Sequence, residues 1–572
     1  MLISVSYRTL TEKNNESFPI RSEMVLAAWA AFVFGLASFA YCFRHDLLLL
    51  YGDAVAHLYI GRRTLASRNP GFRQLGSVWL PLPHILLLPF VSVSAWWRNG
   101  LAGALVSLPS YVVGCAGLYR LARIWLPVSA ALLALAFYAL NPGLLYMATT
   151  AMTEPLFLAE MIWATLLIVL WHCAVHAMDG DLAAAAIAKR NVETMRQASA
   201  ATLLISAGLV LVAAIFTRYD GWILAAATWC LVTTKLVLHR RFTKSVLRSY
   251  ALFTALLAVA PAIWLAYNAK LFGDPLDFLR GPYSARAIEA RTATAGAAMH
   301  PGFHSLHVAA LYFLKAAEMG AAPARFGNWL LWLAAAGTLI ALYFFGRKQI
   351  WPALLLWLPL PFYAYSVAYG SVPIFIPLWW PFSWYNTRYG MEMLPALALF
   401  AACPIGLLHV FAPRLERWVT VVLLILIGWN SIVLLRSRPL VFQEAVANSR
   451  TRIAFERALA NALLNLPAEG LILMYTSQDA GAVQLAGISL HRIVSEEDYL
   501  EWQHALEEPA QAAPVVIALD GDPVASAIQR HPQGLVLIQK VCSTGQPCAR
   551  IYHSLMYTPR FPAASAGKGG AS

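Results

Sequence analysis

The chain has 572 residues, of which 59% are hydrophobic and only 12% are charged. Soluble domains carry about 25% charged residues, so this composition excludes an ordinary soluble protein and indicates a polytopic membrane protein. The net charge of +13 does not require nucleic acid, because Lys and Arg gather in the cytoplasmic loops of membrane proteins. No nucleic-acid partner is expected, since the sequence has no basic soluble domain with interleaved aromatic residues.

The N-terminal part of the chain predicts an uncleaved membrane anchor. Residues 1–23 are mostly polar and are expected to form a cytoplasmic segment. The apolar run 24–43 is longer than the hydrophobic region of a signal peptide, and no small-residue cleavage site follows it. With roughly 20 apolar residues needed for each span, the expected spans are 24–43, 101–122, 128–148, 155–176, 199–217, 221–238, 250–272, 327–345, 350–369, 389–411 and 418–436.

One further apolar segment, VWLPLPHILLLPFVSVSAWW (78–97), is long enough to cross a membrane but contains three prolines. If it lies at the interface, every short basic loop is cytoplasmic; if it crosses, every one is external. The positive-inside rule therefore favours an interfacial segment, about eleven spans, and external amphipathic helices within residues 44–100. The loop residues that decide this are Arg120, Arg123, Lys189, Arg190, Arg196, His239, Arg240, Arg241, Lys244, Arg248, Arg347, Lys348, Arg414 and Arg417.

The C-terminal part changes character after the membrane domain, which is expected over residues 24–439. Short strand-like runs alternate with helix-like stretches, which predicts a small extracytoplasmic α/β domain over 440–560, followed by a disordered tail over 561–572. The strand-like runs are 472–477, 515–520 and 534–541, and the helix-like stretches are 496–508 and 522–530. Cys542 and Cys548 flank a predicted hairpin, where a disulfide and two free thiols both remain open.

Ionisable residues collect at the ends of the expected spans on the external side. In YGDAVAHLYIGRR (51–63), Asp53 and His57 lie four residues apart, on one face of a helix, and Arg62 and Arg63 follow. A purely structural interpretation also exists, because a carboxylate near a helix N-terminus is favoured by the helix dipole.

A second acid, Glu154, opens the span that follows ATTAM, where Thr153 is suited to cap the helix and Pro155 is tolerated in its first turn. Glu160 lies deeper in the same helix, and a carboxylate at membrane depth is a functional candidate by default. Here too, favourable interaction with the helix dipole is the structural alternative for Glu154.

Three more external segments carry candidates. Arg218 and Asp220 lie in the turn FTRYDGW, where they are also able simply to pair with each other. Arg388 and Tyr389 open a late span in SWYNTRYGMEMLPAL, and the expected loop 273–326 is rich in Arg, His and Gly. Arginine forks suit phosphate, and a carboxylate can act as a base toward a hydroxyl or amine. A lipid-linked phosphate would enter such a site laterally, with its tail in the bilayer.

These residues, in this order, resemble the GT-C integral-membrane glycosyltransferases. The branch that the chain is most similar to is glycosyltransferase family 39, the protein O-mannosyltransferase and aminoarabinose-transferase group. The resemblance covers roughly residues 20–440. It is carried by Asp53, by the WLPLPH run from Trp79 to His84, by Glu154 after NPGLLYMATTAM, and by Arg388-Tyr389 with Leu394-Pro395.

The resemblance implies transfer of a sugar from a polyprenyl-phosphate carrier to an extracytoplasmic protein, lipid or polysaccharide, with inversion, by a multi-pass enzyme of the plasma membrane. It implies that Asp53 is the base and Glu154 the second external acid. The carrier and acceptor would be bound by residues drawn from His57, Arg62, Arg63, His84, Arg218, Asp220, Arg388 and Tyr389.

The sequence also departs from the family pattern. Many family members have Asp-Glu at the first site, where this chain has Asp53 followed by Ala54, and many have Asp at the second site, where this chain has Glu154. The basic residue that usually precedes the paired prolines is missing, and the nearest substitute is His84, which follows them. No compact metal-ligand motif is present, so a divalent cation such as Mg²⁺ or Mn²⁺ stays open. The alternatives are a flippase or transporter of lipid-linked sugars, a ligase that uses a pyrophosphate carrier, and a non-catalytic GT-C scaffold. Against a transporter stand the external placement of the acids and the lack of an internal repeat.

Overall fold

The computed structural model describes residues 20–177, 199–238, 243–292, 299–344, 350–477 and 479–558. The chain forms two compact units. The first takes its residues from the chain up to His57, from Gly76–Phe90 and from Gly100–Ala447. The second combines Leu58–Leu75 and Val91–Asn99 with the chain from Asn448 onward. Several of the basic loop residues predicted to be cytoplasmic lie outside the described residues: Lys189, Arg190, Arg196, His239, Arg240, Arg241, Arg347 and Lys348.

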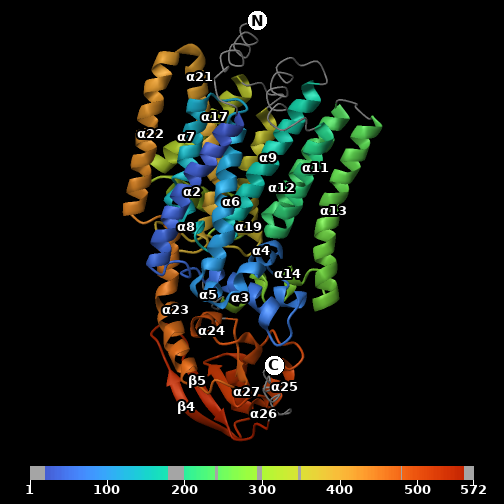
Figure 1. The fold of residues 1–572 in the computed structure, drawn as a ribbon, viewed down its shortest axis with the longest axis vertical. Coiled ribbons are helices and arrows are strands. Elements are labelled where there is room, and N and C mark those ends of the chain that lie inside the picture. Colours follow the sequence, from blue (N-terminus) through green and yellow to red (C-terminus); the bar gives the residue numbers. More distant parts are fainter. Residues whose placement is uncertain are drawn as a thin grey trace, which may run out of the picture. The chain divides into compact units, whose positions relative to one another are not determined.

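The first unit is helical (Figure 1). Its elements are α2 (Ile20–Arg44), the start of α3 (Gly52–Ala66), α4 (Leu82–Val91), α6 (Leu101–Ala122), α7 (Val128–Ala139), α8 (Pro142–Met147), α9 (Glu154–Ala177), α11 (Ala200–Thr217), α12 (Asp220–Leu238), α13 (Lys244–Phe272), α14 (Asp277–Arg280), α15 (Ala285–Thr292), α16 (Leu306–Ala321), α17 (Phe326–Phe344), η2 (Trp351–Trp357), α19 (Pro359–Tyr369), η3 (Thr387–Met393), α20 (Leu394–Ala401), α21 (Cys403–Phe411), α22 (Pro413–Arg436) and the start of α23 (Leu440–Leu464).

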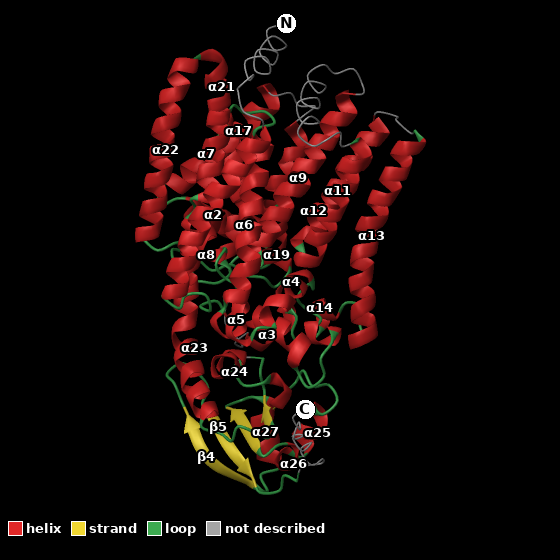
Figure 2. Ribbon diagram, in the orientation of Figure 1, coloured by secondary structure: helices red, strands yellow, loops and turns green. Residues whose placement is uncertain are grey.

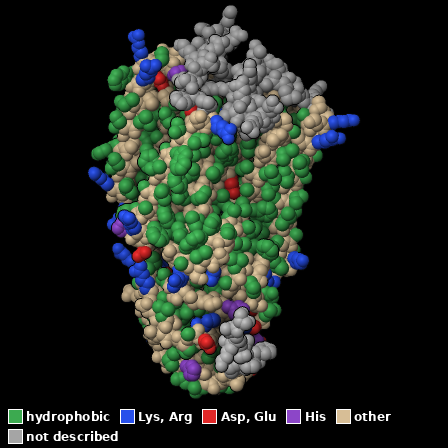
Figure 3. All heavy atoms as spheres, in the orientation of Figure 1, with side chains coloured by type: hydrophobic (Ala, Val, Ile, Leu, Met, Phe, Trp, Pro, Cys, Tyr) green, Lys and Arg blue, Asp and Glu red, His purple; other side chains and the backbone are tan. Residues whose placement is uncertain are grey.

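Nine helices in the described part of the chain are long and apolar enough to span a membrane. The expected count of about eleven is not confirmed, because two expected spans are broken at proline. Pro142 starts α8 after Asn141, whose side chain accepts a hydrogen bond from the Leu144 amide, and Pro359 starts α19. Large apolar side chains such as Trp329 and Trp418 remain exposed on the long helices, as expected of residues that face lipid. Figure 3 shows hydrophobic side chains over most of the viewed face.

The segment 78–97 does not form one helix. It contains α4, which has ten residues and includes Pro89, and then α5 (Ser94–Asn99). Neither helix has the roughly 20 residues needed to cross a bilayer. The expected loop 273–326 is also structured: it contains α14, α15 and α16, and α16 packs against η3 and α19.

The C-terminal part of the chain, in the second unit, contains the predicted α/β fold (Figure 2). Its five-stranded sheet has the order β2-β1-β3-β5-β4, with β1, β2 and β3 parallel and β5 antiparallel to both of its neighbours. The strands are β1 (Ile472–Met474), β2 (Ile493–Val494), β3 (Val515–Leu519), β4 (Leu535–Val541) and β5 (Ala549–Ser554). The helical elements are α24 (Ala480–Ala486), η4 (Leu490–Arg492), α25 (Trp502–Glu507), α26 (Pro509–Ala512) and α27 (Pro523–Arg530). Sequence patterns located β1, β3, β4 and α27 closely, but β2 is too short to produce a recognisable pattern.

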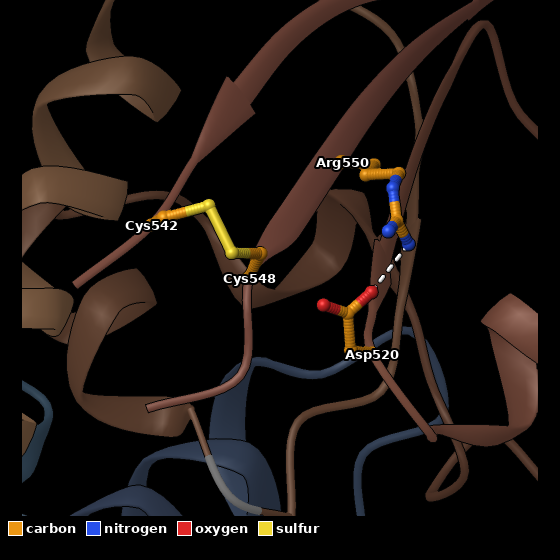
Figure 4. The surroundings of a disulfide bond; sticks show 4 residues. All are labelled: Asp520, Cys542, Cys548 and Arg550. Atoms are coloured by element: carbon orange, nitrogen blue, oxygen red, sulfur yellow. Dashed lines mark hydrogen bonds and ion pairs between the residues drawn. A yellow bond between two sulfur atoms is a disulfide. The ribbon is translucent and has the colours of Figure 1, made fainter. Parts of the chain in front are cut away.

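Cys542 and Cys548 form a disulfide, with 4.4 Å between their Cα atoms. The bond closes the loop between β4 and β5, beside the ion pair of Asp520 and Arg550 (Figure 4). Of the two alternatives that the sequence left open, the structure therefore contains the disulfide. Disulfides persist in oxidising compartments, which fits an extracytoplasmic location for this hairpin.

A buried carboxyl group makes the stability of the second unit depend on pH. Glu496 accepts hydrogen bonds from the Thr476 amide and hydroxyl, at 2.9 and 3.1 Å. Burial, together with the negative charge of Glu497, raises the pKa of Glu496 from 4.5 to about 7. Because the folded-state pKa exceeds the unfolded one, protonation stabilises the fold fully below pH 4.5, and this contribution is lost as the pH rises through about 7.

We therefore expect the second unit to be more stable at pH 5.5 than at pH 8, by on the order of 2 kcal/mol. Hydrogen exchange of the amides in β1 and β3 of the full chain measures this, after correction for intrinsic exchange rates. Glu496→Gln should reduce the pH dependence, although Asp479, whose pKa burial also raises to about 7, will retain part of it. Equal slopes in the wild type and the variant would contradict this assignment.

Candidate active site

Arg388 holds three carboxylates in the first unit. Its Nη2 lies 2.6 Å from Asp53 Oδ2, its Nε lies 3.0 Å from Glu154 Oε1, and its Nη1 lies 3.3 Å from Glu444 Oε1. The side chains of Glu154 and Glu444 are each only 1% exposed, whereas that of Asp53 is 40% exposed. Asp53 and Arg388 are separated in the sequence by more than half of the chain. They meet at the more exposed end of an otherwise buried cluster.

Arg218 forms a second centre that shares Glu154 with the first. Its Nη1 donates to Thr153 Oγ1 at 2.9 Å and lies 3.3 Å from Glu154 Oε1. Its Nε lies 3.1 Å from Asp220 Oδ2. The two arginines therefore contact the same oxygen of Glu154. The predicted pairing of Arg218 with Asp220 is present, but it is only one part of this larger network. Thr153 was expected to cap α9, and its hydroxyl contacts Arg218.

Three helix N-termini meet at this cluster. Asp53 is the second residue of α3, Glu154 is the first residue of α9, and Asp220 is the first residue of α12. Helix N-termini favour negative charge through unpaired backbone N–H groups and the helix dipole. The sequence predicted that these acids lie at helix starts. The folded chain brings the three helix starts together, and their N-termini favour binding of an anion there.

Tyr389 lies between the two guanidinium groups. Its ring centroid is 5.0 Å from the Arg388 Cζ atom and 5.2 Å from the Arg218 Cζ atom, and it stacks on Tyr363 at 4.8 Å. A ring at this distance favours cations by cation–π attraction and fixes the two arginines side by side. Tyr389 was a predicted substrate-binding residue, and the structure places it in the cluster.

The Tyr363 hydroxyl joins Arg218 to two carboxyl groups. Its oxygen accepts from Arg218 Nη2 at 2.8 Å and lies 3.0 Å from Asp220 Oδ2 and 2.6 Å from Glu392 Oε1. The one hydrogen of the phenol is therefore shared between two acceptors. Asp220, the first residue of α12, also accepts from the Gly221 amide at 3.2 Å.

Glu392 is the second acid at Tyr363, and it accepts from the phenol. Its side chain is fully buried, and its Oε1 also lies 3.3 Å from Arg218 Nη2. Arg218 therefore contacts Glu392 as well as Glu154 and Asp220.

The two predicted histidines pair with each other. His57 Nδ1 lies 2.9 Å from His84 Nε2, both side chains are buried, and the His57 ring packs 4.5 Å from the Trp79 ring. Burial, together with the positive charges of Arg388 and Arg218, lowers the pKa of His57 to about 3. The imidazole is therefore neutral at physiological pH, so it carries no charge that would bind phosphate. The pair connects α3 to the WLPLPH run instead.

Arg62 and Arg63 are engaged elsewhere, in the second unit. Arg62 donates to the Val91 and Ser92 carbonyls, each at 2.8 Å. Arg63 donates to the Gln74 carbonyl at 2.7 Å and forms an ion pair with Glu497 at 2.5 Å. The structure therefore does not bring these two predicted phosphate ligands into the cluster around Arg388.

Sequence reasoning missed Glu392, Glu444 and Tyr363. Glu444 accepts from the backbone amides of Asn386 and Thr387, at 3.0 and 2.8 Å, and so holds the residues before Arg388 in place. Glu392 could have been found, since it is a carboxylate inside an apolar run. Glu444 and Tyr363 carry no such signal, because an acid after a span and a tyrosine within one are both common.

Among the residues that the structure describes, no group of three or more His, Cys, Asp and Glu side chains is arranged to hold a metal ion. The carboxylates of the cluster instead converge on guanidinium groups.

No protein-family model matches this sequence, and no curated protein matches it. The fold is similar to ArnT from Cupriavidus metallidurans bound to undecaprenyl phosphate, with a TM-score of 0.54 and 14% identity over 94% of this chain and 99% of ArnT. The apo ArnT structure matches over the same shares, with a TM-score of 0.51 and 15% identity. The oligosaccharyltransferase of Archaeoglobus fulgidus with Zn and sulfate has a TM-score of 0.40 and 13% identity, over 81% of this chain and 63% of that one, and no argument rests on it.

The fold of the chain is thus similar to that of ArnT. This confirms the fold class expected from the sequence: a helical membrane domain with a small C-terminal α/β part.

Proposed function

We propose that the protein is a membrane glycosyltransferase that moves a sugar from a polyprenyl-phosphate carrier to an extracytoplasmic acceptor, with inversion. The observation that carries this proposal is the geometry of one cluster. The buried Arg388 and the largely buried Arg218 share Glu154, and the partly exposed carboxylate of Asp53 lies 2.6 Å from Arg388. Groups suited to bind phosphate therefore lie beside a carboxylate that is open to an acceptor.

The arginines suit the carrier phosphate. A guanidinium offers five N–H donors in a planar fork that matches phosphate, and three helix N-termini add to the positive potential. As the bond between sugar and phosphate breaks, negative charge develops on the phosphate, and preorganised donors stabilise that charge. ArnT, which has a similar fold, was crystallised with undecaprenyl phosphate, which supports a carrier of this class.

Asp53 is the proposed base. It is the most exposed carboxylate among the three that contact Arg388, so an acceptor hydroxyl or amine can approach it from water. Glu154 has a different proposed role: it bridges Arg388 and Arg218 and sets the distance between them. Asp220 and Tyr389 are proposed to position the two arginines.

The site and the C-terminal α/β part are proposed to be extracytoplasmic, in a plasma membrane. The nine apolar helices support a multi-pass protein. The Cys542–Cys548 disulfide supports an oxidising compartment for the C-terminal part. The predicted placement of the basic loops inside the cell supports the same orientation for the membrane helices.

Radiolabelled sugar transfer tests this function. The purified full chain in proteoliposomes is supplied with a panel of polyprenyl-monophosphate sugars, each paired with a polyprenyl-pyrophosphate sugar. We expect one monophosphate donor to be consumed, with release of free polyprenyl phosphate. Consumption of pyrophosphate donors alone would indicate the ligase alternative. Movement of intact donor across the bilayer without cleavage would indicate a flippase.

A further inference from the structure

Asp53 differs from the other two partners of Arg388 in how it is held. Glu444 is fixed by two backbone amides and the Thr387 hydroxyl, and Glu154 is also bound by Arg218. In the described part of the chain, the Asp53 side chain has one hydrogen-bond partner, Arg388. Buried charges are costly to separate from their partners, whereas a solvent-exposed carboxylate is rehydrated when it leaves. Asp53 is therefore the partner of Arg388 that is most easily replaced.

One oxygen of the proposed base is engaged by Arg388. Asp53 Oδ2 accepts from Arg388 Nη2 at 2.6 Å, a short charge-assisted hydrogen bond. While this bond lasts, the lone pair of Oδ2 that faces Arg388 is not available to take a proton from the acceptor. Release of the bond makes both oxygens of the carboxylate available.

We propose that the carrier phosphate replaces Asp53 on Arg388 Nη2 and thereby frees the Asp53 carboxylate to act as base. This inference rests on the proposed function and adds an order to it: the donor binds first, and its binding activates the base for the acceptor. A phosphodiester and an aspartate each carry one negative charge, so Arg388 Nη2 keeps an anionic partner through the exchange. The guanidinium fork accommodates either anion.

The transfer step then balances. The acceptor oxygen or nitrogen forms a bond to the anomeric carbon while its proton moves to the Asp53 carboxylate. The bond between the anomeric carbon and the phosphate oxygen breaks, and its electron pair stays on that oxygen. The leaving carrier phosphate gains one negative charge, beside Arg388. Asp53, which is 40% exposed, returns its proton to water and pairs with Arg388 again once the carrier leaves.

The exchange predicts that removing the competing carboxylate improves binding of the carrier. We expect Asp53→Asn to bind undecaprenyl phosphate roughly tenfold more tightly than the wild type, although its sugar transfer is strongly reduced. A merely structural ion pair would leave binding unchanged or weaken it. Binding is measured by titrating the detergent-purified full chain with undecaprenyl phosphate at fixed ionic strength. Asp53→Ser is a second variant for the case that asparagine disturbs the fold.

Asp46→Asn is the matched control. Asp46 is an exposed acid seven residues earlier in the same unit, so the variant removes one negative charge without touching Arg388. Tighter binding in both Asp53 variants, with Asp46→Asn unchanged, supports the exchange. The exchange is overturned if the wild type binds undecaprenyl phosphate and the folded Asp53 variants bind it no more tightly. It is also overturned if Asp46→Asn tightens binding equally. In both cases the proposed function still stands. If the wild type does not bind undecaprenyl phosphate at all, the proposed function fails together with this inference.

Discussion

Replacing Asp53 with asparagine is expected to lower sugar transfer by about 10²- to 10⁴-fold, the usual contribution of a general base. Asparagine has nearly the same shape and still reaches Arg388, but it accepts no proton from the acceptor. The loss should appear in kcat, because the phosphate-binding arginines are intact. The measurement is the initial rate of sugar transfer as a function of the concentration of the donor that the wild type consumes.

Two controls separate chemistry from folding in this experiment. The variant should unfold at a temperature close to that of the wild type, because a partly exposed ion pair contributes little to stability. Asp46→Asn, which removes a remote exposed acid, should transfer sugar at the wild-type rate. Transfer by Asp53→Asn within threefold of wild type would exclude Asp53 as the base and would make Glu154, the next acid of the cluster, the candidate to test.

Replacing Arg388 with methionine is expected to abolish transfer and to destabilise the first unit by about 3–5 kcal/mol. The change leaves the buried Glu444 without its cation and leaves Glu154 with Arg218 alone. Breaking a buried ion pair on one side is costly, since the remaining charge stays desolvated. Thermal unfolding of the purified variant, with transfer assayed below its midpoint, measures both effects.

A double variant shows whether the lost stability comes from uncompensated charge. Arg388→Met combined with Glu444→Gln should be more stable than Arg388→Met alone, because the second change removes the orphaned charge. Arg414→Met, which removes an exposed arginine at the start of α22, is the matched control and should be neutral. Equal stability of the single and double Arg388 variants would show that Glu444 does not depend on this ion pair.

The sequence predicted the fold class because its signals are local. Apolar runs of about 20 residues identify long helices without any knowledge of their neighbours. Strands alternating with helical stretches likewise identified the C-terminal α/β part. The count of spans was not predictable in the same way, because a proline such as Pro142 or Pro359 is tolerated inside some membrane helices and breaks others, and packing decides between these outcomes.

The candidate site was predictable only in part. Residues at helix starts could be found from the sequence, whereas their partners, which lie far away in the sequence, could not. Asp53, Glu154, Asp220 and Arg388 were found because each is a charged residue at or beside the start of an expected helix. Their partners were not predictable, since the ion pair of Arg388 with Asp53 joins residues 335 positions apart. Arg62 and Arg63 stand close to Asp53 in the sequence, and their contacts lie in the second unit.

By itself, the sequence determined that this chain is a membrane protein with helices whose ends carry acids and arginines. It did so because hydrophobic runs and charge placement are properties of short segments. Only the tertiary structure decided that three helix N-termini converge on Arg218 and Arg388, that Glu392 and Glu444 complete the cluster, and that Asp53 alone among the partners of Arg388 faces solvent. Burial and ion pairing depend on which helices pack together, and packing is not a property of any one segment.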